Sequence, residues 1–174
     1  MTTEAAVADT PYAKDPTDMA ATLKAKVKQG QPTFFRLRAQ LPAQGRTDTP
    51  MAASEKQWVV LKTYAACGEN ELHAHPNEDH TFVVLQGRAK FHGPAGEERI
   101  IGLHEGVLLP HGTFYWFRAL GDEPLVMVRI GSAAIDGRDP YARIAEDGHP
   151  MEGNSAENKE VELELTDQWF GPTG

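Results

Sequence analysis

The sequence contains almost no cysteine and no long apolar run. Cys67 is the only cysteine among 174 residues, which excludes an intrachain disulfide, and we read it as a small half-buried residue in preference to a reactive thiol. No window approaches the roughly 18 apolar residues of a membrane span. The first ten residues, MTTEAAVADT, lack the basic and then apolar pattern of an export signal. We therefore expect a cytoplasmic protein without a membrane partner.

Positive charge is also scarce. The chain has 17 Lys and Arg against 25 Asp and Glu, which gives a formal net charge of -8. Such a balance keeps a protein soluble and argues against binding to a phosphate backbone, so we expect no nucleic-acid partner. The sequence also lacks repeats of 20 to 50 residues, which excludes a solenoid. A chain of this length fits a single globular core.

The first part of the chain, residues 1–32, is predicted to be an arm followed by a helix. Asp15 or Thr17 can cap the helix, and Pro16 suits its first turn. Met19, Leu23 and Val27 then recur at helical spacing until Gly30 ends the pattern.

From residue 33 the pattern changes to short β-branched and aromatic segments separated by Gly, Pro, Asn and Asp. Eight strands without an intervening helix predict an all-β antiparallel barrel or jelly roll over residues 33–131. The polar segment 39–56 is predicted to be a loop at the rim or a lid. The expected strands are Thr33 to Arg38, Gln57 to Ala65, His80 to Gln86, Arg88 to His92, Glu98 to Ile101, Gly106 to Leu109, Thr113 to Ala119 and Pro124 to Gly131.

Residues with period two along these strands are expected to line the barrel interior. They are Trp58, Val60, Phe82, Val84, Phe117, Val126 and Val128. After Gly131 the chain becomes rich in turn residues, and residues 132–174 are predicted to be a tail. Its apolar end, Val161 to Leu165 with Trp169 and Phe170, is expected to pack on the barrel or on a partner subunit.

Three of the seven histidines, His73, His75 and His80, fall within eight residues. Residues i and i+2 of a strand point to the same face, so His73 and His75 can offer two imidazoles to one ion. Pro76, Asn77 and Asp79 indicate a turn that returns His80 as a third ligand. Imidazole ligands suit Zn, Cu, Fe and Ni. The other four histidines are not expected to form a site.

The segment from Gly68 to Gly87 resembles the first motif of the cupin superfamily: a Gly, His-x-His, three or four residues, a Glu, six residues and a Gly. Here four residues separate His75 from His80, and six separate His80 from Gly87, so His80 occupies the Glu position. Glu78 or Asp79 is the alternative ligand if the register slips.

The segment from Gly106 to Tyr115 resembles the second cupin motif, in which a fourth His ligand follows Pro-x-Gly. Tyr115 occupies that position here. Three roles remain open for Tyr115: it ligates the metal, it moves a proton or orients a substrate, or it fills space in the barrel.

The resemblance implies a small single-domain cupin, a double-stranded β-helix or jelly roll with a short N-terminal helix, and one divalent metal. Three neutral histidine ligands favour an anionic ligand and are similar to the sites of non-haem iron oxygenases. We therefore expect an iron-dependent, dioxygenase-like enzyme that acts on a small chelating substrate, with Tyr115 as catalytic residue. The alternatives are a non-redox lyase, hydrolase or isomerase using Zn, Ni or Mn as a Lewis acid, and a non-catalytic binding or sensory protein. Zn, Ni, Mn and Cu are the alternatives to iron as the bound metal. A homodimer is the expected assembly.

Overall fold

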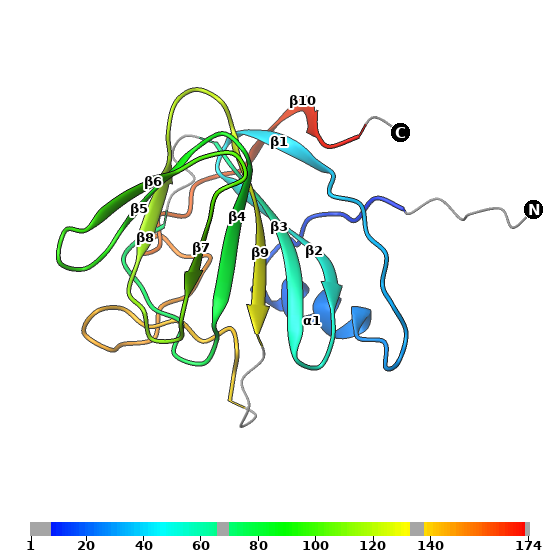
Figure 1. Ribbon diagram of the computed structural model, residues 1–174, viewed down its shortest axis with the longest axis horizontal. Helices are drawn as coiled ribbons and strands as arrows, with labels where there is room; N and C mark the ends of the chain where they lie inside the picture. The colour runs from blue at the N-terminus through cyan, green and yellow to red at the C-terminus, as the bar shows by residue number, and fades with distance from the viewer. Residues whose placement is uncertain (1–7, 66–69, 133–137, 173–174) are drawn as a thin grey trace, which may run out of the picture.

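The computed structural model describes residues 8–65, 70–132 and 138–172, so Cys67 and Gly68 lie outside the described residues. One helix, α1 (Pro16–Lys26), precedes ten strands within these ranges (Figure 1). The strands are β1 (Ala39–Gln44), β2 (Arg46–Ala53), β3 (Gln57–Tyr64), β4 (His80–Gln86), β5 (Ala89–His92), β6 (Glu98–Ile101), β7 (Gly106–Leu109), β8 (Trp116–Ala119), β9 (Leu125–Ser132) and β10 (Glu164–Phe170).

The predicted helix is confirmed. Asp15 is its N-cap, and the side chain accepts a hydrogen bond of 2.8 Å from the backbone N–H of Asp18. Lys24 and Lys26 stand in the last turn, where positive charge complements the helix dipole. Leu23 and Met19 pack against Trp58 and its neighbours on β3. No helix in the described part of the chain is long and apolar enough to cross a membrane.

The strands form antiparallel sheets, which confirms the predicted all-β jelly roll. A five-stranded sheet has the order β2-β3-β9-β4-β7, a three-stranded sheet the order β6-β5-β8, and β1 pairs with β10. Over the described residues the sheets do not close into one barrel, so the fold is an open jelly roll. Phe82 and Val84 on β4 meet Phe91 on β5 and Phe117 on β8, so the main apolar core lies between the two larger sheets.

Strands β3 and β9 are buried on both faces. Lys62 pairs with Met127, and Leu61 pairs with Val128, so the two pairs lie on opposite faces of the sheet. Val126 packs with Leu61 against β1 and β2, outside the main core. The prediction that Val126 and Val128 line the interior is therefore wrong, because a strand covered on both faces has no polar face to mark its phase.

Two predictions before residue 57 are also wrong. Residues 33–38 form no strand, and the expected loop 39–56 contains β1 and β2. Pro50 concealed β2, yet it sits at a register shift on an edge strand, where a missing backbone N–H is tolerated. On β2, the hydroxyl of Thr47 bonds that of Thr63 across the sheet at 2.7 Å in a buried position.

The segment after β9 lies against the sheets of the same chain. Ile144 forms an isolated bridge with Ala74, and β10 pairs with β1. Arg46 on β2 donates a hydrogen bond of 2.7 Å to the carbonyl of Gly153. This segment therefore covers the end of the jelly roll next to the histidine-rich stretch.

Candidate metal centre

The stretch from His73 to His75 is extended and held on both sides. Backbone hydrogen bonds of 3.0 and 3.1 Å join His73 to Tyr115, and two bonds of 3.0 Å join Ala74 to Ile144. Ala74 is completely buried on the opposite side from the two imidazoles. The spacing argument for His73 and His75 thus corresponds to the local geometry.

His80, the first residue of β4, lies beside this stretch. Its ring centroid is 4.8 Å from that of His75, and the His75 ring is 5.1 Å from that of His73. All three side chains are buried. The three histidines that were singled out from the sequence therefore lie together, as rings in successive contact.

Tyr115 completes one side of the group. Its hydroxyl oxygen lies 3.1 Å from Nε2 of His80, and its ring centroid is 4.7 Å from that of His73. Burial raises the pKa of Tyr115 to about 12, so the phenol keeps its proton at neutral pH. The position suits a hydrogen-bond donor to an imidazole or to a ligand in the site.

Glu78 lies on the other side of the rings and is almost fully buried. Its carboxylate oxygens lie 3.5 Å from Nδ1 of His75 and 4.0 Å from Nδ1 of His80. Burial raises the pKa of Glu78 to about 7, although Arg129, at 2.5 Å, opposes this effect. The sequence suggested Glu78 only as a substitute for His80, whereas the structure places it next to both histidines.

The imidazoles are held in their neutral form. Burial, with further contributions from Arg129 and Arg143, lowers the pKa values of His73 and His75 well below the usual range. The same burial lowers the pKa of His80 to about 2. Neutral imidazole is the form that binds a metal ion.

Several polar atoms here are buried without a hydrogen-bond partner in the described residues: His73 Nε2, His75 Nδ1, His80 Nδ1 and Glu78 Oε1. Such atoms are costly to bury unless something binds them. Nδ1 of His73 lies 2.7 Å from the carbonyl of Glu71, an arrangement that leaves Nε2 free to act as a ligand. The donor set therefore fits a metal ion.

Two ligand sets share His75 and His80. The set expected from the sequence adds His73. Ligand atoms of His75, Glu78 and His80 lie within 4.8 Å of one another, so Glu78 supplies an alternative third ligand. Two histidines with one carboxylate, like three histidines, are ligands for a divalent transition metal.

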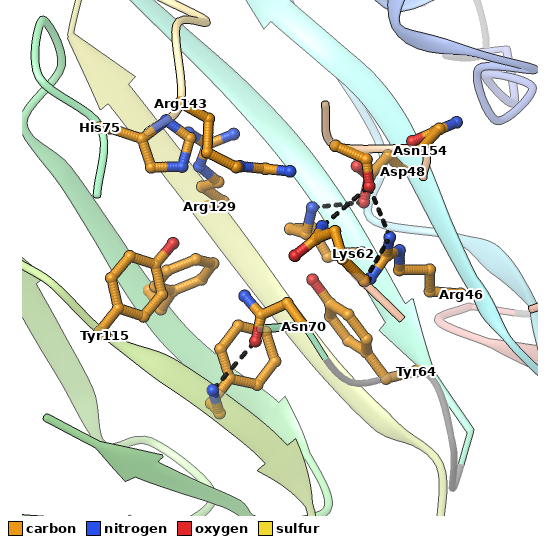
Figure 2. Close-up of a pocket in the computed structure, with 14 residues that line it drawn as sticks. Arg46, Asp48, Lys62, Tyr64, Asn70, His75, Tyr115, Arg129, Arg143 and Asn154 are labelled. Atoms are coloured by element: carbon orange, nitrogen blue, oxygen red, sulfur yellow. Dashed lines mark hydrogen bonds and ion pairs between the residues drawn. The ribbon is translucent and has the colours of Figure 1, made fainter. Parts of the chain in front are cut away.

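Basic residues surround a cavity beside the histidines and were missed in the sequence. Figure 2 shows His75, Arg129 and Arg143 near one another, with Lys62, Asp48 and Arg46 across the cavity. Lys62 and Arg129 lie on the same strand face as core residues. A charged residue at a position where the strand alternation predicts a buried side chain could have indicated a functional site. Arg143, in an irregular segment, gave no such indication.

The remaining histidines lie outside this group. His92 stacks on Trp116 with ring centroids 3.8 Å apart. His111 is exposed and contacts Asp79, and His149 contacts Asp147 and Glu157 on the surface. His104 occupies a turn with positive φ.

The jelly roll and the buried histidine cluster define a small β-protein with a candidate metal centre. Residues 60–131 match the family model described as "Cupin domain". The match begins within β3, ends in β9 and includes His73, His75, His80 and Tyr115. No curated protein matches the sequence significantly.

Several solved structures are similar to this chain. KdgF from Halomonas sp. is 21% identical over 53% of this chain and 82% of its own, with a TM-score of 0.48. An RmlC-like cupin from Shewanella frigidimarina is 13% identical over 63% and 92%, with a TM-score of 0.46. A point mutant of Bacillus subtilis oxalate decarboxylase OxdC is 20% identical over 63% and 30%, with a TM-score of 0.49. These identities are too low to transfer an activity.

Proposed function

We propose that the protein is a metal-dependent cupin enzyme, an oxygenase that acts on a small chelating organic substrate. The observation that carries the proposal is the group of buried imidazole and carboxylate atoms without hydrogen-bond partners among the described residues. His75 and His80, with His73 or Glu78, would hold the ion. A facial set of two histidines and a carboxylate is typical of non-haem iron oxygenases, which supports iron as the metal.

When bound, iron would supply Lewis-acid and one-electron chemistry toward dioxygen. The chain's own residues do the remaining work. Phe82 and Phe117 line the cavity beside His75 and limit the access of water. Tyr115 holds a proton near His80 and can donate a hydrogen bond to a substrate oxygen. Glu78 accepts a hydrogen bond from Arg129, which holds its carboxyl group within reach of two imidazoles.

The first test is the metal content of protein purified without added metal. We expect about one iron per chain, and oxygen uptake when small diketones, catechols, thiols or 2-oxo acids are added. Replacement of a shared ligand, His75→Ala, removes the iron, whereas His111→Gln, which changes an exposed histidine outside the cluster, retains it. Comparison of His73→Gln with Glu78→Gln identifies the third ligand.

The outcomes separate the competing functions. Zinc without oxygen uptake on any substrate would overturn the oxygenase. Absence of metal, together with an unchanged melting temperature in His75→Ala, would overturn the metal centre and favour a binding protein.

A second function, a lyase, hydrolase or isomerase with the metal as Lewis acid, is favoured by one observation. Tyr115 retains its proton to about pH 12 and lies 3.1 Å from His80 Nε2, a position from which it can act as a general acid. Tyr115→Phe distinguishes the two: a Lewis-acid enzyme loses kcat by about a hundredfold, while an oxygenase that uses Tyr115 for orientation changes mainly in KM.

A further inference from the structure

Arg143 is brought to the candidate metal centre by a single backbone pairing. Ile144 pairs antiparallel with Ala74, so Arg143 lies alongside His75. Figure 2 shows the Arg143 side chain next to His75 and Arg129 at the cavity. A residue nearly seventy positions away in sequence thus forms part of the wall beside the histidines.

The guanidinium of Arg143 has unused donors. Its Nε and Nη1 atoms are buried and have no hydrogen-bond partner in the described residues. The neighbouring cations differ in having an ion-pair partner: Arg129 bonds Glu78 at 2.5 Å and Lys62 bonds Asp48 at 2.6 Å. Nε of Arg129 is also buried without a hydrogen-bond partner in the described residues. Burial lowers the pKa of Arg143, but a guanidinium remains protonated in proteins. A buried cation with free donors is a binding site for an anion.

Arg143 also lines a second cavity, which is larger than the one drawn in Figure 2. This second cavity has one charged side and one apolar side. Its volume is about 120 Å³. His75, Arg129 and Arg143 line the charged side, and residues of α1 and β3 line the apolar side, namely Met19, Leu23, Trp58 and Val60. A protein cavity of about 150 Å³ holds benzene, so this one suits an anion of about six heavy atoms or fewer.

Two carboxylates also line this cavity, and both are engaged. Asp48 pairs with Lys62, and Asp15 accepts the N–H of Asp18 at the start of α1. Asp48 attracts the charge of Arg143, but neither carboxylate forms a hydrogen bond or ion pair with Arg143 in the described part of the chain.

We propose that this cavity binds a small monocarboxylate with a short apolar body. The carboxylate accepts hydrogen bonds from Arg143, whose planar fork matches two carboxylate oxygens, and the apolar body lies against α1 and β3. The inference rests on the proposed function only in treating this anion as the substrate of the metal centre. Binding itself requires no metal.

The experiment titrates isobutyrate into metal-free protein and measures its Kd by NMR shift perturbation. Isobutyramide, which has nearly the same shape without the charge, is the matched ligand. Arg143→Gln removes the fork, Arg143→Lys keeps the charge alone, and Arg118→Gln changes an exposed arginine on β8 as the control variant. Far-UV circular dichroism and melting curves verify that each variant folds.

We expect isobutyrate to bind wild type and Arg118→Gln equally, and Arg143→Gln at least about tenfold more weakly, because a hydrogen-bonded charge pair is lost. Arg143→Lys falls between them, and isobutyramide binds weakly to all. Equal Kd values in wild type and a folded Arg143→Gln variant overturn the proposal and leave Arg143 a structural residue. If inorganic phosphate binds more tightly than isobutyrate, the proposal that the ligand is a carboxylate is wrong.

The same titration on protein loaded with iron separates this inference from the proposed function. Arg143-dependent binding in a protein that takes up no metal supports the anion site and contradicts the metal enzyme. Uptake of metal by a protein whose isobutyrate binding does not depend on Arg143 supports the metal enzyme and contradicts the anion site.

Discussion

At the scale of single residues, the candidate centre combines groups that titrate in opposite directions. The pKa values of His73, His75 and His80 lie below their usual range, and the pKa of Glu78 is raised to about 7. In every case burial is the main cause, because it disfavours the charged form of each group. The folded protein without metal therefore carries fewer charges at its centre than the sequence suggests.

The stability of the metal-free protein is expected to fall in acid. The unfolded chain takes up three histidine protons as the pH falls below about 6.5, whereas the folded chain does not, so these groups destabilise the fold at low pH. Glu78 acts oppositely: its contribution is complete below about pH 4.5 and is lost as the pH rises through 7. The net difference of about two protons predicts a loss of about 2 to 3 kcal/mol per pH unit between pH 6 and 5.

Urea unfolding of EDTA-treated protein at several pH values measures this slope. His80→Gln is expected to reduce the slope by the amount that corresponds to about one proton, and Glu78→Gln to increase it by the same amount. A stability that stays flat from pH 6.5 to 5 would show that the histidines are not buried as neutral groups.

Strand spacing pointed to His73 and His75 because strand periodicity is local. The turn before His80 and the resemblance to the first cupin motif added His80, and the resemblance to the second motif added Tyr115. The sequence pattern did not reveal the roles of Glu78 and Arg129, which bond each other although they are about fifty positions apart in the sequence. Glu78 lies just before β4, and Arg129 lies on β9. The ion pair depends on the pairing of β4 with β9, and that register lies outside any short window.

At the scale of elements, β9 is the strand against which the centre is built. Gly131 pairs with both Trp58 on β3 and His80 on β4. A Cβ at this position would overlap Glu78 Oε1 and Trp58 Nε1. Because Gly131 has no side chain, the buried carboxylate of Glu78 can occupy the space beside β9.

Gly131→Ala is expected to destabilise the protein by about 1 to 3 kcal/mol, because Glu78 or Trp58 must shift. It is also expected to weaken metal binding if Glu78 is a ligand. Gly102→Ala is the matched control, since a Cβ there would meet Arg88 Cγ at an ordinary 3.5 Å. Chemical denaturation measures both variants, and equal stability of the two would contradict the close packing inferred at Gly131.

Strands β3 to β9 could be located from the sequence because β-branched and aromatic runs end at Gly, Pro or Asp. Strands β1 and β2 could not, since Pro42 and Pro50 interrupt them and both strands have bulged registers. Turn residues within a strand conceal it unless the partner strand is known.

At the scale of the whole molecule, the predicted homodimer can be tested on the edge strands. Leu108 on β7 is 64% exposed, and β7 is an edge of the five-stranded sheet. An exposed apolar residue on an open edge favours pairing with another chain. We expect light scattering to give twice the 19.1 kDa chain mass.

Leu108→Lys is expected to return the mass to about 19 kDa. Ile100→Lys, on the edge strand β6 of the smaller sheet, is the comparison and should leave the dimer intact. A wild-type mass of about 19 kDa would reject the dimer.

The backbone pairing of Ala74 with Ile144 joins two parts of the chain that contribute different residues to the site. His73, His75 and His80 lie within residues 60–131, which match the cupin model, whereas Arg143 lies in the segment after them. Side-chain substitutions around residues 140–154 that keep the backbone pairing of Ile144 with Ala74 can therefore change the shape and charge of the cavity while the histidine cluster stays in place. This segment is therefore a place at which the protein can be engineered. Replacing residues 140–154 by a segment with other side chains, on the same jelly roll, offers a route to cavities that bind other ligands.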